Sequence, residues 1–399
     1  MLTFRKSVIA AVFLITCIFL LRSSHSSSAA PQTPSPASTA GEQDTDAADT
    51  PQPQAEEQKK NLVPQLSPEE LASKPLRERL RYQFPYDIES KFPAYIWQTW
   101  KYTPASGSFE EQLRPYEASW TELHPGFIHE VVPDDTAFHL IRYLYASMPE
   151  IQEAYQALPL GVLKADFFRY LILLARGGIY SDIDTIALKP AIDWLPPDLD
   201  RSTVGLVIGI EADPDRPDWH QWYSRRIQFC QWTIQAKPGH PVLRDVVATI
   251  TEDALRMKKA GILTKSKMDK SIVEFTGPAV WTDAVFRYFN NPEYFKDEKG
   301  VTRNITAMDF TGIKEHKKVG DVVVLPITSF SPGVQQMGAE DVDSPMAFVK
   351  HEFEGTFFYH LPRLYPIPSL TSNQGHGNRN GNARSAPKDR HTAPIDERS

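Results

Sequence analysis

Apolar and aromatic residues are unevenly distributed along this chain of 399 residues, and their distribution separates an ordered middle from two polar ends. Residues 23–81 contain no Phe, Tyr or Trp and consist largely of Ser, Pro, Thr, Ala, Gln and Glu. Such a segment buries too little apolar surface to offset the entropy lost on ordering. We therefore expect a disordered stem over residues 23–81 that ends in a short helix near 68–81. A folded domain over residues 82–365 and a disordered tail over residues 366–399 should follow.

Short apolar runs alternate with helical periodicity inside the expected folded domain. Strand-like runs occur at residues 94–99, 179–188, 203–211 and 321–327. The clearest helical pattern covers residues 162–176, and Gly177-Gly178 ends it. Five apolar residues share one face of this helix: Leu163, Phe167, Tyr170, Leu171 and Leu174. Strands that alternate with helices predict an α/β fold whose central sheet is mostly parallel and flanked by helices.

A separate, almost purely apolar segment lies at the N-terminus. Arg5 and Lys6 precede an apolar run over residues 7–21, and Arg22 follows it. Positive charges ahead of such a run keep the N-terminus in the cytoplasm. We expect a cytoplasmic tail over residues 1–6, an uncleaved signal anchor over 7–22, and the remainder in the secretory lumen. The small residues 28–30 leave a cleaved signal peptide as the alternative.

Charge and cysteine content exclude several classes of protein. A net charge of −7 over this length, without a dense basic patch in the middle of the chain, argues against a nucleic-acid-binding protein. The two cysteines, Cys17 in the apolar run and Cys230, exclude a disulfide framework and a cysteine metal site. The sequon that begins at Asn304 is a candidate for N-glycosylation in the lumen.

Two carboxylates interrupt the apolar run GGIYSDIDTIALKP at residues 177–190. If residues 179–188 form one strand, the side chains of Asp182 and Asp184 point to the same face and converge. Two such carboxylates repel each other unless a positive charge lies between them. Oxygen ligands suit a hard divalent cation, and that cation could also neutralise a departing diphosphate.

The preceding helix carries a second charged pair. Asp166 and Arg169 are three residues apart in an otherwise apolar stretch, so they are neighbours on one helix face. One interpretation is a local ion pair that stabilises a half-buried helix. The other is a ligand site, with Arg169 on a phosphate or sugar hydroxyl and Asp166 accepting from hydroxyls.

A competing chemistry fits the same triplet. Residues 182–185 read Asp-x-Asp-x-Thr, as in haloacid-dehalogenase-like phosphatases, where the first Asp attacks phosphorus. That motif normally ends the first strand of its domain, whereas here it lies about ninety residues into the folded part. Gly320-Asp321 supplies only half of the late acidic motif of those enzymes. We therefore favour the metal site.

Several long segments, not only this triplet, carry a resemblance to a known family. They include residues 96–101, 161–190, 205–219, 225–243, 275–285, 318–333 and 346–355. Over about residues 92–358 the chain resembles the fungal initiation-specific α-1,6-mannosyltransferases of the Golgi, which are DXD glycosyltransferases with a GT-A-type fold. The resemblance implies a type II Golgi membrane protein that transfers mannose from GDP-mannose, with retention, to a high-mannose N-glycan core. It also implies Mn²⁺ as the metal and other Golgi mannosyltransferases as partners.

The resemblance assigns roles on the donor side. Asp184 would bind the metal directly, Asp182 would reach the ribose and the metal's waters, and Asp166 with Arg169 would hold the donor sugar. These four residues form the expected catalytic set. His351 would be the third metal ligand, with His360 as the fallback. The nucleotide would contact three further residues: Gln98, Trp100 and Tyr180.

The acceptor side is less well determined. Glu211 and Asp283 are candidates near the acceptor or the reacting carbon, and Trp281 is a candidate platform for a sugar ring; a core position is the alternative for Trp281. The alternative function is a paralogous Golgi α-mannosyltransferase that elongates mannan or acts as a subunit of a mannan polymerase complex. A non-catalytic member is disfavoured because the four charged residues are intact.

Overall fold

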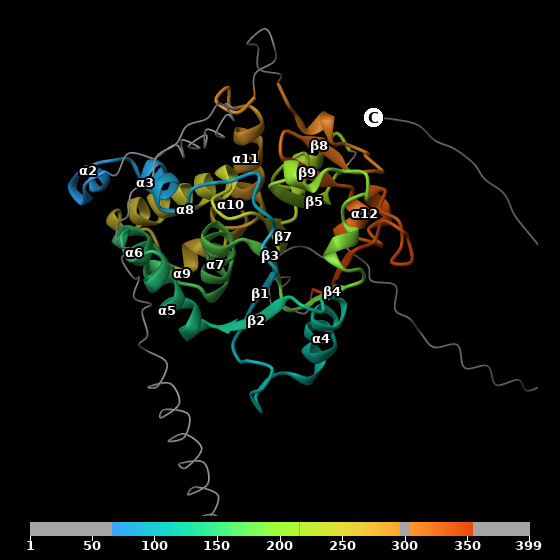
Figure 1. The fold of residues 1–399 in the computed structure, drawn as a ribbon, viewed down its shortest axis with the longest axis horizontal. Helices are drawn as coiled ribbons and strands as arrows, with labels where there is room; N and C mark the ends of the chain where they lie inside the picture. The colour runs from blue at the N-terminus through green and yellow to red at the C-terminus, as the bar shows by residue number, and fades with distance from the viewer. Residues whose placement is uncertain (1–65, 215, 296–303, 354–399) are drawn as a thin grey trace, which may run out of the picture. The chain divides into compact units, whose positions relative to one another are not determined.

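The computed structural model describes residues 66–214, 216–295 and 304–353 (Figure 1). The expected anchor, residues 23–65 of the expected stem, the C-terminal tail and His360 lie outside these ranges. Among the helices within them, none has both the length and the apolar character required to cross a bilayer.

An eight-stranded sheet forms the centre of the fold, in the order β2-β1-β3-β7-β5-β9-β8, with β6 beside β5. Its strands are β1 (Tyr95–Trp100), β2 (Ile128–Pro133), β3 (Gly178–Ser181), β5 (Leu206–Ala212), β6 (Gln228–Phe229), β7 (Thr233–Ala236), β8 (Lys317–Val319) and β9 (Val322–Leu325). Strands β2, β1, β3, β5 and β9 run in one direction, and β7 runs against both β3 and β5. The expected mostly parallel sheet is confirmed, with antiparallel β7 inserted at its centre.

Helices cover both faces of this sheet. The main ones are α4 (Arg114–Leu123), α5 (Asp134–Leu144), α6 (Pro149–Ala157), α7 (Gly161–Arg176), α8 (Pro241–Lys259) and α11 (Pro278–Phe289), and the shorter ones are α9 (Lys265–Met268), α10 (Ile272–Phe275) and α12 (Ile327–Phe330). Adjacent strand residues enter different cores, as with Trp97 and Ile96, because side chains alternate across a sheet. Figure 1 shows α5 to α8 gathered on one side of the sheet and α4 and α12 on the other.

Helix α7 is buried on more than the single face that its periodicity predicts. Phe168, Ile172 and Leu173 are buried as completely as the predicted stripe, because α7 packs against α8 as well as the sheet. Gly177 and Gly178 then reverse the chain into β3 with φ angles of 64° and 96°. A Cβ on Gly178 would lie 2.6 Å from the carbonyl oxygen of Tyr95. Only glycine therefore allows the chain that leaves α7 to begin β3 this close to β1.

The expected strand over residues 179–188 is wrong in one respect, because it is two strands. β3 ends at Ser181, a turn closed by the Thr185 N–H and the Asp182 carbonyl follows, and β4 (Thr185–Ala187) leaves the main sheet. β4 pairs with β10 (Val349–His351) in a separate two-stranded antiparallel sheet. The expected strand at 203–211 also begins later, because residues 201–203 form a 3₁₀ turn.

The packed body begins ahead of residue 82, the boundary that we expected. Two helices, α2 (Pro68–Ala72) and α3 (Leu76–Gln83), stand where one short helix was expected. Leu76 and Leu80 of α3 join the core, and the Arg77 guanidinium pairs with Asp245 of α8 at 2.8 Å. The last part of the range assigned to the disordered stem is therefore folded.

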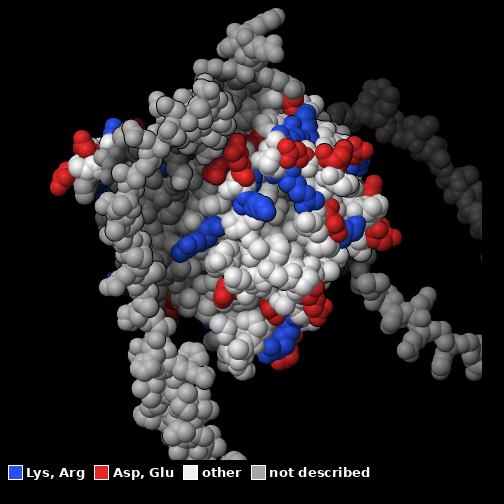
Figure 2. Space-filling model, viewed as in Figure 1, with Lys and Arg blue, Asp and Glu red and all other residues white. Residues whose placement is uncertain are grey.

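Surface charge is mixed on the face that Figure 2 shows. Acidic and basic side chains are intermingled in the upper right and along the lower edge of this view, basic groups lie near its centre and to the left, and uncharged residues fill the area between. Mixed charge of this kind creates no strong field of a single sign over the face in view.

Candidate metal and donor site

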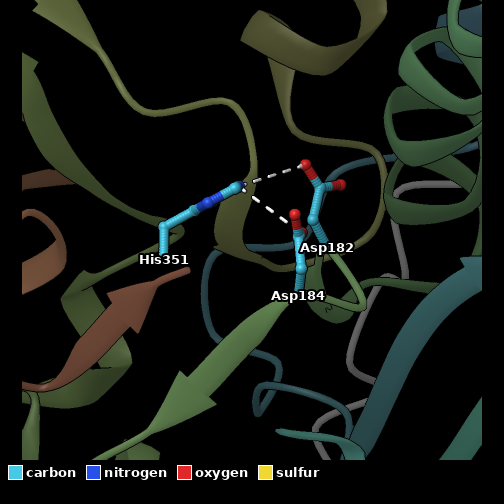
Figure 3. A group of neighbouring side chains, drawn as sticks. All are labelled: Asp182, Asp184 and His351. Carbon is cyan, nitrogen blue, oxygen red and sulfur yellow. Dashed lines mark ion pairs between the residues drawn. The ribbon is translucent and has the colours of Figure 1, made fainter. Parts of the chain in front are cut away.

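Three potential metal ligands converge beyond the carboxyl end of β3, an interior strand of the sheet. One ligand atom from each of Asp182, Asp184 and His351 lies within 4.8 Å of the other two. The His351 Nε2 atom is 3.9 Å from Oδ2 of Asp182 and 3.6 Å from Oδ1 of Asp184 (Figure 3). The structure thus brings together the three residues that we expected to bind metal.

A turn and a strand pairing bring the three residues together. The turn between β3 and β4, rather than a continuous strand, places Asp182 and Asp184 near each other. The β4–β10 pairing aligns His351 with Thr185, and the Glu352 N–H donates to the Asp184 carbonyl at 2.8 Å. A segment far along the chain is therefore fixed directly against the triplet.

The three residues fit a divalent cation. Two carboxylates and one imidazole are ligands that Mn²⁺ accepts. The Phe353 N–H donates to Nδ1 of His351 at 2.9 Å, so Nε2 carries the proton of the neutral ring and faces the carboxylates. Binding of a cation at Nε2 would displace that proton, as metal binding to histidine requires.

Arg169 and Tyr180 hold the carboxylate of Asp182. Arg169 Nη2 and the Tyr180 hydroxyl both donate to Oδ1 at 2.9 Å, and the guanidinium lies 5.0 Å from the centre of the Tyr180 ring. Burial alone would raise the pKa of Asp182, but Arg169, His351 and Tyr180 hold that pKa below its usual value. Asp182 is therefore kept ionised, with Oδ2 turned toward His351.

Asp166 is fixed by groups from three parts of the chain. Arg169 Nη1 lies 3.0 Å from Oδ1, Gln231 Nε2 donates to Oδ1 at 3.1 Å, and Thr276 Oγ1 donates to Oδ2 at 2.8 Å. The residue is only 2% exposed. Burial raises the pKa of Asp166 to about 6, and the nearby positive charge and hydrogen bonds only partly oppose it. The local ion pair with Arg169 is present, but it extends to Asp182 and so belongs to the site.

Two of the expected nucleotide contacts act on Asp182 instead. Gln98 and Tyr180 are fully buried. Gln98 Nε2 donates to the Asp182 carbonyl at 3.1 Å, and its Oε1 accepts from His129. In this structure both side chains are turned to Asp182 and not to an open surface, and their direct contact with the nucleotide stays a prediction.

Trp100 occupies a different position. It is half-buried at the end of β1, packs against a small apolar cluster that contains Ile183 of the triplet, and donates its indole N–H to Glu110. Its ring therefore lies beside the site with part of its surface open, as a nucleotide contact requires.

The structure separates the three acceptor-side candidates. Glu211 is half-buried at the end of β5 and accepts from Gln228 at 2.9 Å; burial raises its pKa, although the hydrogen bond from Gln228 opposes the rise. Asp283 forms a bidentate pair with Arg225 at 2.6 and 2.5 Å. Trp281 is fully buried, stacks on Tyr170 and donates to the Cys230 carbonyl, so its expected role as a sugar platform is wrong.

Sequence reasoning missed the residues that support the site. Thr276 and Gln231 bind Asp166, and the Trp232 carbonyl accepts from the Asp182 N–H at 2.9 Å. One feature of the sequence could have indicated them: Gln231 is a polar residue within the apolar run that leads into β7. Asn304, the candidate glycosylation site, is exposed.

Comparison with known proteins agrees with this geometry. Residues 110–200 match the family model described as "Glycosyltransferase sugar-binding region containing DXD motif". The chain is 49% identical over 71% of its length to the initiation-specific alpha-1,6-mannosyltransferase of Candida albicans, covering 76% of that protein. It is 43% identical over 69% of its length to the protein of the same name from Schizosaccharomyces pombe, covering 66% of it.

A third relative carries a less specific name. The chain is 40% identical over 72% of its length to the putative glycosyltransferase HOC1 of Saccharomyces cerevisiae, covering 71% of that protein. The matched segments contain both the triplet and the buried charges of α7. The chain is a glycosyltransferase and belongs to the family of the initiation-specific α-1,6-mannosyltransferases.

Proposed function

We propose that this mannosyltransferase moves mannose from GDP-mannose to the core of a high-mannose N-glycan through an α-1,6 linkage, and so initiates the outer chain. The convergence of Asp182, Asp184 and His351 beside the buried Asp166–Arg169 pair carries the proposal. Such a set suits a sugar attached to a diphosphate. The names of the relatives support the proposed acceptor and linkage. We also propose a GT-A-type fold, because the chain belongs to this family.

The three ligands would hold a divalent cation, which we propose to be Mn²⁺. When bound, it would supply Lewis-acid neutralisation of the diphosphate. Arg169 adds a permanent positive charge next to Asp182. Tyr180 and Gln98 fix the orientation of Asp182, so the ligand does not need to reorganise as substrate binds.

Transfer from an α-linked donor to an α-linked product retains configuration, and we propose front-face transfer. The bond from C1 to the phosphate oxygen breaks, and a bond from C1 to the acceptor oxygen forms on the same face. The proton of the acceptor hydroxyl passes to the leaving phosphate. Glu211, half-buried at the end of β5, is proposed to lie on the acceptor side of this reaction.

We also propose that the protein is a single-pass type II membrane protein of the Golgi. Residues 1–6 would be cytoplasmic, 7–22 the anchor, and the folded domain lumenal, with other mannosyltransferases of the same compartment as proposed partners. The apolar run between Arg5 and Arg22 supports this arrangement. Carbonate extraction should leave the full-length protein in the membrane pellet. A soluble species that begins near residue 31 would instead indicate a cleaved signal peptide.

The full-length protein in detergent tests the proposed reaction. It is given GDP-mannose, Mn²⁺ and either a high-mannose N-glycan or a short linear α-1,6-mannan, and the new linkage is mapped by NMR. We expect one α-1,6-mannose on the N-glycan core. Elongation of the linear chain without reaction at the N-glycan would reject initiation in favour of the elongating paralogue.

A further inference from the structure

The loop between β5 and β6, of which the structure describes residues 213–214 and 216–227, is held at both ends by side-chain contacts. Arg226 Nη1 pairs with Asp213 at 2.6 Å, and Gln228, just after the loop, donates to Glu211, just before it. Asp213 also accepts from the Gly312 N–H at 2.7 Å. The two ends of the loop therefore have fixed positions at the end of β5.

An exposed tryptophan lies within this loop among polar groups. Trp222 is 36% exposed, and the Arg216 guanidinium lies 5.2 Å from the centre of its ring. Arg216 in turn binds Asp218 through two hydrogen bonds of 2.5 and 2.8 Å. Arg216 and Asp218 neutralise each other, so the loop presents an aromatic ring beside hydrogen-bonding groups with no net charge.

The loop continues directly into the donor site. Three residues after Gln228, the Gln231 side chain binds Asp166, and the carbonyl of Trp232 accepts from the Asp182 N–H. β5 runs in the same direction as β3, so the loop leaves the same edge of the sheet as the triplet. A ligand that reaches from the triplet past Glu211 would next meet this loop.

We propose that Trp222, with the Arg216–Asp218 pair, binds a mannose residue of the acceptor glycan. The apolar face of a pyranose would stack on the indole, and its hydroxyls would bond to the carboxylate and the guanidinium. This inference rests on the proposed function, because that function makes the acceptor a branched, neutral glycan. It also supplies the aromatic platform that Trp281, buried in the core, does not provide.

A neutral sugar fits this surface better than a membrane or a protein partner does. Membrane binding needs several exposed apolar residues with an excess of basic ones. A protein interface needs a larger buried apolar centre. Trp222, beside a neutralised Arg–Asp pair and with only the half-buried Trp219 and Tyr223 as aromatic neighbours in the loop, offers neither.

Steady-state kinetics of the full-length protein test the proposal. Trp222→Ala should raise the KM for the N-glycan acceptor about tenfold, a loss of roughly 1.4 kcal/mol in binding. The KM for GDP-mannose and the release of GDP without acceptor should not change. Trp222→Phe, which keeps a ring, should recover part of the loss. Binding of the glycan without donor, followed by NMR saturation transfer, should weaken in parallel.

Tyr143→Ala is the matched control, because Tyr143 is a more exposed aromatic residue on α5, 74% accessible. It should leave the acceptor KM unchanged. An unchanged acceptor KM in Trp222→Ala, or an equal rise in Tyr143→Ala, would overturn the proposal. Failure of the wild-type enzyme to act on the N-glycan would instead refute the proposed function, so the two failures are distinguishable.

Discussion

Thr276 donates a hydrogen bond of 2.8 Å to Oδ2 of Asp166. The threonine ends the short helix α10, and the aspartate lies in α7. Gln231 occupies the other carboxylate oxygen, so a side chain that is only 2% exposed has both oxygens paired. Thr276, between α10 and α11, therefore holds Asp166 in place. Because Arg169 contacts both Asp166 and Asp182, this hydrogen bond also helps to position Asp182.

Thr276→Val should weaken both stability and donor binding. The substitution keeps the shape of the side chain but removes the hydroxyl, leaving a buried carboxylate oxygen without its donor. A hydrogen bond to a charged group contributes about 1.5–3 kcal/mol, so the free energy of unfolding should fall by that amount. The KM for GDP-mannose should rise because Asp166 is no longer held in place. Urea denaturation and donor kinetics measure the two effects.

Thr276→Ser separates the hydrogen bond from the packing of the methyl group. Serine keeps the hydroxyl, so the donor KM should return close to that of the wild type. If serine and valine raise the donor KM equally, the hydrogen bond does not position Asp166.

Elements with strong apolar patterns could be predicted from the sequence. β1, β9 and α7 each lie within one or two residues of the predicted range, because a buried strand or helix requires apolar side chains throughout its length. β7 and β10 could not be predicted. They are short, contain polar residues, and depend on partners that no local pattern specifies.

The division of residues 179–188 into two strands shows the same limit. Ile183 and Ile186 continue the apolar pattern through the turn, so the sequence indicates one strand. Only the pairing of β4 with β10 draws the chain out of the main sheet. That pairing also delivers His351, which was found by resemblance and not by any spacing in the chain.

The sequence does not distinguish a buried position from a ligand-binding one for side chains that have both apolar and polar parts. Trp281, Tyr180 and Gln98 are all fully buried, yet each makes a hydrogen bond through its polar end. The same residue types occur in ligand sites, where the polar end contacts the ligand. Burial distinguishes these two uses, and burial depends on long-range packing.

Asp184→Asn should abolish transfer while the protein remains folded. The amide keeps the shape of the side chain but is a much poorer ligand for a hard cation. We expect transfer to fall at least a hundredfold and the melting temperature to change by only a few degrees. Asp193→Asn, at an exposed position in a 3₁₀ turn, controls for the loss of one charge. Near wild-type activity of Asp184→Asn in saturating Mn²⁺ would exclude the metal role.

His351→Ala should raise the Mn²⁺ concentration needed for half-maximal activity. Loss of a residue that only orients a metal ligand typically costs about 10–100-fold in affinity, and we expect loss of the ligand itself to cost at least as much. Titration of activity with Mn²⁺, together with direct binding of Mn²⁺ followed by electron paramagnetic resonance, measures it. His139→Ala, at an exposed histidine of α5, should leave both curves in place. An unchanged Mn²⁺ dependence in His351→Ala would point to His360 or to no histidine ligand.

Arg169→Lys should destabilise the protein even though the charge is kept. Arg169 bridges Asp166 and Asp182 at 3.0 and 2.9 Å and is almost completely buried. A single ammonium group cannot contact both carboxylates in the way that the guanidinium does. Breaking a buried ion pair costs about 3–5 kcal/mol, and the loss should appear in urea denaturation. A loss of activity with unchanged stability would mean that Arg169 acts only on the substrate.

A carboxylate with a structural role lies at the other end of the sheet, where the parallel strands begin. Asp321, just ahead of β9, accepts hydrogen bonds from the hydroxyls of Tyr86 and Tyr288, and it lies 3.4 Å from Nε2 of the buried His240. Burial would raise its pKa, but His240 and the two hydroxyls hold the pKa of Asp321 well below its usual value.

In Asp321→Asn, the free energy of unfolding should therefore fall less steeply than in the wild type as the pH is lowered below about 5. A carboxylate whose pKa is lower in the folded state stabilises the protein above its unfolded pKa of about 4, and this contribution disappears as the pH falls further. The variant should be about 1–3 kcal/mol less stable than the wild type at pH 7. That gap should narrow between pH 5 and pH 2 in urea denaturation. Asp198→Asn, at an exposed position, controls for charge. A gap that stays constant with pH would show that ionised Asp321 contributes nothing.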